Sequence, residues 1–428
     1  MPALLCVAAV VVAAALVAVD RVSQEPLTPG WVDFLLYRVG SDGSRDLLGA
    51  IATSSLAVAG TTFSITMAVL ALTSSSYGPR LVRNFMADKG NQTVLGVYVA
   101  TFVYCLLVLR SVRVLGDLGG DGDVFVPHLA VNGAVLLAIA NVGMLIYFIH
   151  HISDSVQVAT LAGRVRMELL DTVERLYPAD LGPSGGPPLP DLSGDGRPVT
   201  AGRAGYLQSV AQDVLMRAAR RRDVVVELTV RPGDYVLPDT VLAMIRPDRA
   251  VNDRLVRTLR RALLVTDART PYQDVGFAMQ QLTEMAVRAL SPGTNDPYTA
   301  QNAIDDLSAG LSVLVSRPPP SPWRRDDHGV VRVHAATPDV VLLLGTSLDQ
   351  LRWYGAGAPS VMQSCVTLIE RVAAHVRPPA PGEAPQLQQQ LLAHLDLLAD
   401  AFSAAGHHPD DQARFGDRVR CARQLILA

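Results

Sequence analysis

Between Leu47 and Thr73 the chain carries no charged residue, and this stretch is long enough to cross a lipid bilayer as one helix. Ser55, Thr62, Thr66 and Thr73 follow one another at spacings of seven, four and seven residues. At ~100° per residue they lie close to one line along such a helix. Because a hydroxyl stripe on a membrane helix faces protein or water, these four residues are candidates for lining a pore. The alternative is that they bond their own helix or a neighbouring one.

The N-terminal third of the chain is apolar enough for several membrane-spanning helices. The chain is 49% hydrophobic and 18% charged, which is typical of a polytopic segment joined to soluble parts. Small residues at Ala15–Ala18 resemble a signal-peptide cleavage site, so three spans after cleavage are the alternative to four. We predict an α-helical transmembrane domain over residues 1–152, with spans at about 3–19, 47–73, 94–115 and 124–149.

Charge and cysteine usage indicate where such a protein resides. The lysine and arginine counts of the loops on the two sides nearly tie, so the positive-inside rule decides little. The long C-terminal region has no paired cysteine spacing, which favours a reducing compartment. We therefore predict a multi-pass protein of the bacterial inner membrane with both termini in the cytoplasm. A net charge of −3 gives no reason to expect nucleic acid as a partner.

Beyond the last span we predict a helical extension and a Pro/Gly-rich linker over residues 153–202, then a mostly helical α+β cytoplasmic domain over 203–428. A helix over Tyr206–Arg222 opens this domain. Alternating apolar residues and the turn Pro232-Gly233-Asp234 predict a small β unit at about 223–246. Its phrase VRPGDYVLPDTVLAMI resembles the turn of lipoyl- and biotinyl-type folds, but it has no lysine to modify. Further helices are predicted at 251–266, 272–290, 297–315, 340–354, 360–376, 385–405 and 410–427, with a strand at 330–334.

Two short motifs are candidate binding sites. Arg80 and Arg83, just after the second span, suit lipid phosphates or another anion, and the alternative is control of topology. The string RALSPGTNDPYTA, residues 288–300, ends one helix and starts the next, with Asp296 as the cap. Exposed amides in this turn suit an anion, and a purely structural turn is the alternative. Its candidate residues are Ser291, Gly293, Asn295 and Asp296.

The sequence contains few of the residue patterns that bind a metal, hold a cofactor or catalyse a reaction. Lys89 is the single lysine, so Schiff-base chemistry, a P-loop and a biotinyl or lipoyl carrier are disfavoured. His150 and Asp154 on one helix, and the pair His407-His408, each bring too few donors together for zinc. No nucleophile, metalloprotease or dinucleotide-binding motif is present. We predict neither a cofactor nor a metal site, and the sequence favours a role other than that of an enzyme.

Three strings carry a family resemblance. FSITMAVLALTSSSYGPRLVRNF (63–85), GNQTVLGVYVATFVYCLLVLRSV (90–112) and RALSPGTNDPYTA (288–300) resemble the bacterial predicted membrane proteins of domain-of-unknown-function family 2254. RPGDYVLPDTVLAMI matches the β segment of the same family, so the similarity covers nearly the entire chain. The resemblance implies an integral inner-membrane protein with a soluble C-terminal region. It brings no activity, cofactor or catalytic residue with it.

Two functions remain open from the sequence. In the first, a homo-oligomeric channel or transport-like protein passes an ion or small solute along the hydroxyl stripe and is regulated by the cytoplasmic domain. Several copies are needed because four helices with one such stripe do not easily enclose a pore. In the second, a membrane-anchored sensor or scaffold binds a ligand or partner through its cytoplasmic domain. The expected partners are the lipid bilayer, further copies of the chain, and an ion or small anionic ligand.

Overall fold

The structure is a computed structural model that describes residues 1–22, 40–77, 89–112, 125–156, 158–178, 189–190, 192–377 and 386–427. The chain divides into two compact units, Met1–Gln157 and Val158–Ala428. The predicted fold class is confirmed, because four long apolar helices precede a helical domain with two small sheets. The second unit begins at Val158, so parts of the predicted extension and linker over 153–202 are built into it.

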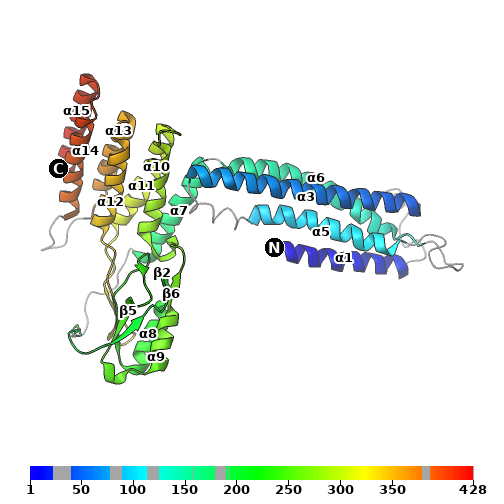
Figure 1. Cartoon of the computed structure of the whole chain (residues 1–428), viewed down its shortest axis with the longest axis horizontal. Helices are drawn as coiled ribbons and strands as arrows, with labels where there is room; N and C mark the ends of the chain where they lie inside the picture. The colour runs from blue at the N-terminus through cyan, green and yellow to red at the C-terminus, as the bar shows by residue number, and fades with distance from the viewer. Residues whose placement is uncertain are drawn as a thin grey trace. The chain divides into compact units, whose positions relative to one another are not determined.

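The N-terminal unit consists of helices that are each long and apolar enough to cross a membrane. They are α1 (Pro2–Val22), α3 (Ser41–Tyr77), α5 (Lys89–Ser111) and α6 (His128–Val156), drawn in blue to teal in Figure 1. Helix α5 contacts the other three and has the largest share of buried residues. The four predicted spans fall on these four helices, and the part of the third beyond residue 112 lies outside the described residues.

Small residues let these helices approach closely. A Cβ added to Gly96 of α5 would lie 2.8 Å from Leu5 Cδ1 of α1. A Cβ added to Gly133 of α6 would lie 2.5 Å from the hydroxyl oxygen of Tyr104, which donates to the Ala130 carbonyl at 2.8 Å. Close packing at glycine is the usual means of helix association where lipid removes the hydrophobic driving force.

A residue near the end of α1 caps the start of α6. Both carboxylate oxygens of Asp20 accept hydrogen bonds from α6, one from the Leu129 amide at 3.2 Å and the other from the Ala130 amide at 3.1 Å. The first turn of a helix leaves its amides without intrahelical partners, so this carboxylate acts as a cap supplied by another helix. Neighbouring Arg21 lies over the ring of Phe125, 5.8 Å from its centroid.

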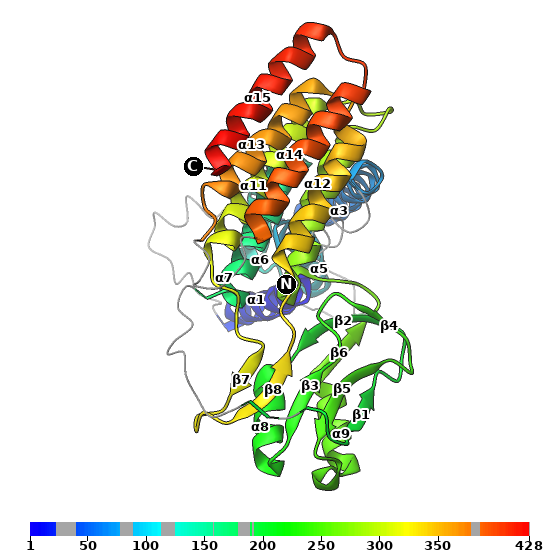
Figure 2. The ribbon, with the colours of Figure 1, turned by 90° about the vertical axis from the view of Figure 1, so that its left-hand side faces the viewer.

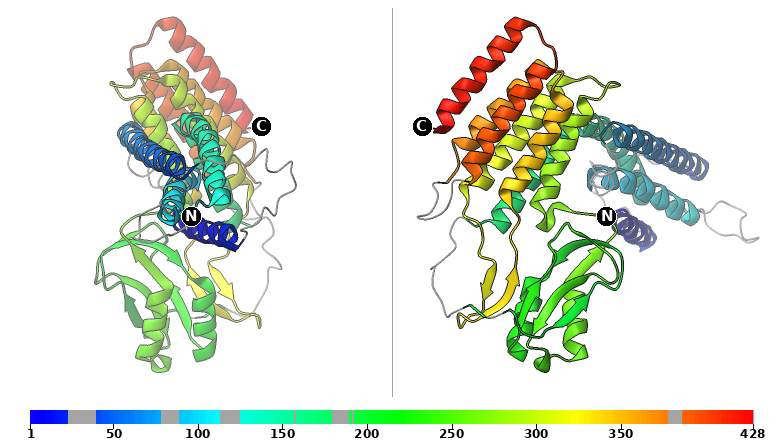
Figure 3. Two further views of the ribbon diagram at one scale, coloured as in Figure 1. Left: turned by 90° about the vertical axis from the view of Figure 1, so that its right-hand side faces the viewer. Right: turned by 60° about the vertical axis from the view of Figure 1, so that its left-hand side comes forward.

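The C-terminal unit has a helical part and a β unit, which Figures 2 and 3 show from three sides. Asp274, Asp296 and Asp339 each accept a hydrogen bond from an amide in the first turn of a helix, which explains why those helices start where they do. The helical part comprises α7 (Val158–Leu176), α10 (Val275–Ala289), α11 (Pro297–Ser316), α12 (Val340–Gly355), α13 (Pro359–Ala373), α14 (Gln386–Ala404) and α15 (Pro409–Leu427).

The β unit has two sheets covered by two helices. The five-stranded sheet has the order β1-β5-β3-β8-β7 and is antiparallel except between β3 and β8. The three-stranded sheet has the order β4-β2-β6 and is antiparallel. Helices α8 and α9 share a hydrophobic core with the strands. The elements are β1 (Arg197–Thr200), β2 (Gly205–Val210), α8 (Gln212–Arg222), β3 (Val225–Leu228), β4 (Tyr235–Val236), β5 (Val241–Arg246), α9 (Asp253–Ala262), β6 (Leu263–Thr266), β7 (Trp323–Arg325) and β8 (Val331–Ala335).

Two predicted helices begin or end differently. The segment predicted as a helix over 206–222 is strand β2 followed by α8, and the one over 251–266 is α9 followed by β6. Strands β2 and β6 pair with each other, with Leu207 opposite Val265. The cause is therefore pairing between distant segments, which overrides the local helical pattern.

Candidate functional site

The hydroxyl stripe of α3 lies partly inside the four-helix unit. Ser55 is 4% exposed and Thr62 3% exposed. The Ser55 hydroxyl accepts a hydrogen bond from Asn141 Nδ2 of α6 at 3.0 Å, and Asn141 Oδ1 accepts one from the Thr101 hydroxyl of α5 at 3.3 Å. The Tyr98 hydroxyl donates to the Asn141 backbone carbonyl at 2.9 Å. A buried polar network thus joins α3, α5 and α6.

The other predicted residues of this region have different surroundings. The Thr62 hydroxyl donates to the Ala59 carbonyl at 2.9 Å, and half-buried Thr66 donates to the Thr62 carbonyl at 2.7 Å. Thr73 lies near the end of α3. Arg80 and Arg83, the predicted anion or lipid contacts, lie outside the described residues. The structure therefore bonds Ser55 to Asn141 of α6, whereas Thr62 and Thr66 are bonded to their own helix.

The turn between α10 and α11 is held by hydrogen bonds within itself. Asp296 accepts from the Thr299 hydroxyl at 2.5 Å and from the Thr299 amide at 3.1 Å, and these bonds lower the pKa of Asp296. Asn295 has φ 44°, and its amide donates to the Ser291 carbonyl at 2.8 Å. Gly293 is exposed, and a Cβ there would meet nothing within 4 Å. These four predicted residues therefore form an exposed capping turn.

Within the described ranges, no group of three or more His, Cys, Asp and Glu side chains is arranged to hold a metal ion. His407, one of the histidines weighed from the sequence, bonds the Ala356 carbonyl at 2.8 Å. Its ring packs on Phe402, with 4.2 Å between the centroids. These contacts give His407 a structural role.

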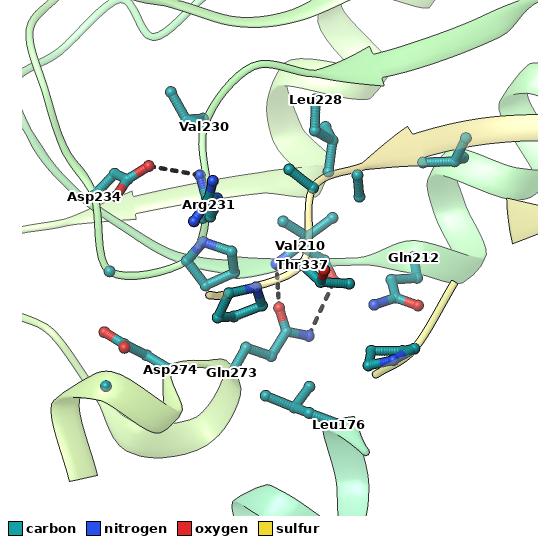
Figure 4. Close-up of a pocket in the computed structure, with 18 of the residues that line it drawn as sticks. Leu176, Val210, Gln212, Leu228, Val230, Arg231, Asp234, Gln273, Asp274 and Thr337 are labelled. Atoms are coloured by element: carbon teal, nitrogen blue, oxygen red, sulfur yellow. Dashed lines mark hydrogen bonds between the residues drawn. The ribbon is translucent and has the colours of Figure 1, made fainter. Parts of the chain in front are cut away.

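A cavity of about 480 Å³ lies inside the C-terminal unit, between the helical part and the β unit. Its size falls within the range of small-molecule sites. It is lined by the end of α7, the start of α8, the turn 231–234, the start of α10 and the segment 336–339 before α12. Figure 4 shows the turn residues Arg231 and Asp234 on one side and Gln273 and Asp274 on another. The turn is the RPGD motif of the predicted β unit.

One wall of the cavity depends on close contact between a glycine and a carboxylate. Gly233 has φ +99°, and a Cβ there would lie 2.3 Å from Asp274 Oδ2. Asp274 is 7% exposed, accepts from the Phe277 amide at 2.9 Å and pairs with Arg269 at 2.8 Å. Burial raises the pKa of Asp274, and Arg269 opposes that rise. Only glycine combines this φ with this approach, so the turn is fixed against α10.

Other polar groups at the cavity also have partners inside the protein. Gln273 accepts from the Val210 amide at 2.8 Å and donates to the Val210 carbonyl at 3.1 Å, as the dashed lines in Figure 4 show. Asp339 accepts from the amides of Val341 at 2.9 Å and Leu342 at 3.2 Å. The side chains of Gln273 and Asp339 therefore stabilise the cavity wall through hydrogen bonds within the protein.

Two buried polar groups at the cavity have no such partner among the described residues. Tyr177 directly follows α7 and is 1% exposed, and its hydroxyl makes no hydrogen bond in the part of the chain that the structure describes. Burial raises the pKa of Tyr177 to about 12, while the charge of Arg231 acts to lower it. Arg324 Nε is likewise buried without a hydrogen-bond partner there. Because buried polar groups are nearly always bonded, this pair identifies the cavity as the candidate ligand site.

The sequence pointed to neither Tyr177 nor Arg324. Tyr177 precedes Pro178, which in the sequence indicates only the end of a helix, and Arg324 follows the proline-rich stretch 318–322, which is typical of a loop. Strand β7, which carries Arg324, has three residues and no alternating pattern long enough to detect. The only sequence signal at this site was the RPGD turn.

Comparisons with known proteins match most of the chain to a family of predicted membrane proteins. A family model described as "Predicted membrane protein (DUF2254)" matches residues 1–371. The chain is similar to the uncharacterized protein Rv1290c of Mycobacterium tuberculosis strain H37Rv, with 33% identity over 367 residues, which is 84% of this chain and 70% of the relative. The uncharacterized protein Mb1321c of Mycobacterium bovis matches with the same identity and coverage. No solved structure matches the chain.

Proposed function

We propose that this multi-pass protein, which belongs to the DUF2254 family of predicted membrane proteins, is a membrane-anchored sensor. In this proposal its C-terminal unit lies in the cytoplasm and binds a small molecule in the cavity beside Tyr177 and Arg324. Helix α7, which directly follows the fourth apolar helix in the sequence, responds to binding. The two cysteines of this unit, Cys365 and Cys421, form no disulfide, which supports a reducing compartment for it.

The observation that carries the proposal is the place of the cavity at the end of α7. Helix α6 ends at Val156 and α7 begins at Val158, so the two are consecutive in the chain. Helix α7 ends at Leu176, and both Leu176 and Tyr177 line the cavity. A ligand that displaces Tyr177 therefore acts directly on the helix that follows the last span.

Two contacts fasten α7 to the wall of the cavity. The Thr172 hydroxyl donates to the Pro271 carbonyl at 2.8 Å, and Arg175 Nε donates to the Tyr272 carbonyl at 3.2 Å. The Arg175 guanidinium also lies 4.7 Å from the centroid of the Tyr272 ring. The segment that receives these bonds leads directly into Gln273, which lines the cavity. A change in this wall is thus transmitted to α7 through bonds as well as through packing.

Native mass spectrometry of the purified full-length chain tests the proposal. We expect a co-purifying small molecule on the wild-type chain and its loss from Ala336→Trp, because Ala336 lines the cavity and a large side chain there obstructs it. Ala404→Trp is the matched control, since Ala404 is exposed on α14 and does not line the cavity. Hydrogen exchange of α7 is expected to differ between wild type and Ala336→Trp. An unliganded wild-type chain whose α7 exchanges exactly as in Ala336→Trp would refute the sensor.

An oligomeric channel is the second candidate, and the hydroxyl stripe of α3 is the observation that favours it. The hydrogen bond from Asn141 to the Ser55 hydroxyl argues against a channel, because it gives one residue of the stripe a partner within a single chain. Cysteine scanning of residues 54–74 with a membrane-impermeant thiol reagent separates the two functions. Labelling that repeats at helical spacing on the stripe, together with flux in liposomes, supports the channel. Protection of Ser55→Cys and Thr62→Cys without flux supports the sensor.

A further inference from the structure

The register of the β7–β8 hairpin places Arg324 on the cavity side of the sheet. Arg324 pairs with Val333, and cross-strand partners project from the same face. Val333 and Ala335 are both buried, both line the cavity, and both belong to the core that α8 covers. The neighbouring residue Arg325 does not line the cavity, and it donates to the Gly329 carbonyl at 2.8 Å.

Arg324 has no counter-ion among the residues that the structure describes. Its side chain makes no ion pair with any described residue, and its buried Nε has no acceptor. Burial lowers the pKa of Arg324, and no nearby carboxylate opposes that effect. A guanidinium remains charged in proteins, and a buried charge is stable only when paired. Arg324 Nε thus lacks an acceptor among the described residues, and an anion bound in the cavity would supply one.

The surroundings of Arg324 favour an anion in two further ways. Helix α8 starts at the cavity after Ala211, which provides no side-chain cap, so its first amides are available to an acceptor although Asp213 adds a negative charge to the same turn. The positive charge of Arg231 also lies close enough to act on the Tyr177 hydroxyl. Four carboxylates line the cavity. Asp274 and Asp339 are helix caps, Asp234 accepts from the Arg231 amide at 2.8 Å, and Asp213 is exposed in the first turn of α8.

Much of the remaining wall is apolar, which sets the second requirement on a ligand. They come from the core side of the β unit, from α8 and from the start of α12, and they include Leu215, Met216, Leu228, Val230 and Leu343. An inorganic anion would leave this surface uncovered, whereas an organic anion would bury it.

We propose that the cavity binds an organic anion, with a carboxylate or phosphate group paired to Arg324 and an apolar body against the β unit. This inference rests on the proposed function, because it names the ligand class for the same cavity. The Tyr177 hydroxyl is the second group available to the ligand. A soluble metabolite and a lipid with an anionic headgroup share this chemistry.

Binding of four probes to the full-length chain in phosphatidylcholine nanodiscs tests the inference. The probes are 4-phenylbutyrate, neutral 4-phenylbutanol with the same body, inorganic phosphate without a body, and dihexanoyl phosphatidylglycerol as a soluble anionic lipid. We expect phenylbutyrate to bind at least about tenfold more tightly than phenylbutanol, since a charge-assisted bond accounts for at least that factor. Stronger binding of the lipid than of phenylbutyrate identifies a headgroup as the source, and the reverse identifies a soluble compound.

Variants of two neighbouring arginines decide whether Arg324 is responsible. We expect Arg324→Gln to remove the preference for phenylbutyrate over phenylbutanol, and Arg325→Gln to retain it. Equal binding of the charged and neutral probes to wild type would refute the anion and leave the sensor standing. A preference that survives in Arg324→Gln would refute the assigned residue. A wild-type chain without a co-purified molecule, whose α7 exchanges as in Ala336→Trp, is the separate result that refutes the sensor itself.

Discussion

Leu169 of α7 lies directly over Gly310 of α11. A Cβ added at position 310 would come within 2.1 Å of Leu169 Cδ2, so the two helices meet at a point where only glycine fits. Helix α7 also contacts α10, and these contacts place it in the packed core of the C-terminal unit. A segment that follows a membrane span in the sequence is therefore part of the structure that holds the cavity.

Replacing Gly310 by alanine is expected to destabilise the C-terminal unit. Overpacking against Leu169 costs about 1–3 kcal/mol, of which the better helix propensity of alanine recovers up to about 1 kcal/mol. Gly163→Ala in α7 is the control, because a Cβ there meets nothing within 4 Å and the change is expected to stabilise slightly. Unfolding of the full-length chain by heat measures both. The double variant Leu169→Ala/Gly310→Ala is expected to be less destabilised than the sum of its parts, and strict additivity would contradict the contact.

Ser55→Ala is expected to destabilise the N-terminal unit by about 0.5–1.5 kcal/mol, the range for hydrogen bonds between membrane helices. The physical reason is that Asn141 Nδ2 loses its acceptor in a buried position. Ser54→Ala is the matched control, since the Ser54 hydroxyl bonds only the Ile51 carbonyl of its own helix. Reversible unfolding in detergent measures the difference. Equal effects of the two substitutions would show that the Asn141 bond contributes nothing.

Tyr177→Phe is expected to stabilise the ligand-free chain by about 1 kcal/mol, because it removes a buried hydroxyl that has no partner. The same substitution is expected to weaken binding of an anion in the cavity. Tyr272→Phe is the control, since Tyr272 is largely exposed and its hydroxyl can reach water. Thermal unfolding with and without 4-phenylbutyrate measures both effects. A loss of stability without ligand would mean that this hydroxyl is already bonded, for instance to ordered water.

The β7–β8 hairpin is expected to weaken in acid. The bond from Arg332 at 2.8 Å, with the amides of Val330 and His328, lowers the pKa of Asp326 to about 2, below its ordinary value of 3.8. The stability from ionised Asp326 is therefore complete above pH 3.8 and is lost as the pH falls towards 2.

Unfolding midpoints of wild type and Asp326→Asn measure this dependence. The variant is expected to be less stable at neutral pH, and the gap to wild type should close on acidification. Asp327→Asn is the control, because Asp327 forms only an exposed pair with Arg220. A gap that stays constant from neutral pH down to pH 2 would contradict the assignment to Asp326.

The helices were predictable because their signals are local. The length of the apolar segments predicted the membrane-spanning helices. Asp296 followed by Pro297 predicted the start of α11 at the residue where it begins. Likewise, the strand predicted at 330–334 is β8 at 331–335. Capping, hydropathy and length are properties of consecutive residues, so they can be read without the fold.

The candidate site was not predictable for the opposite reason. Arg324 reaches the cavity through its pairing with Val333, and Gly233 reaches Asp274 only once the β unit packs on α10. The helix expected over 206–222 begins as a strand because Leu207 pairs with Val265, far along the chain. The hydroxyl stripe was visible, yet its spacing does not say that Ser55 bonds Asn141. Such relationships exist only after distant segments meet.

Because α7 and β1 are built into the C-terminal unit, any attempt to separate the two halves of this protein depends on where the cut is made. A fragment starting at residue 203, just past the Pro/Gly-rich segment, would lack the helix that covers Gly310 and the tyrosine that lines the cavity. It would also expose apolar surface of α10 and α11 to water. Val158 is the starting residue that keeps this half whole, and a soluble preparation begun later would be expected to aggregate.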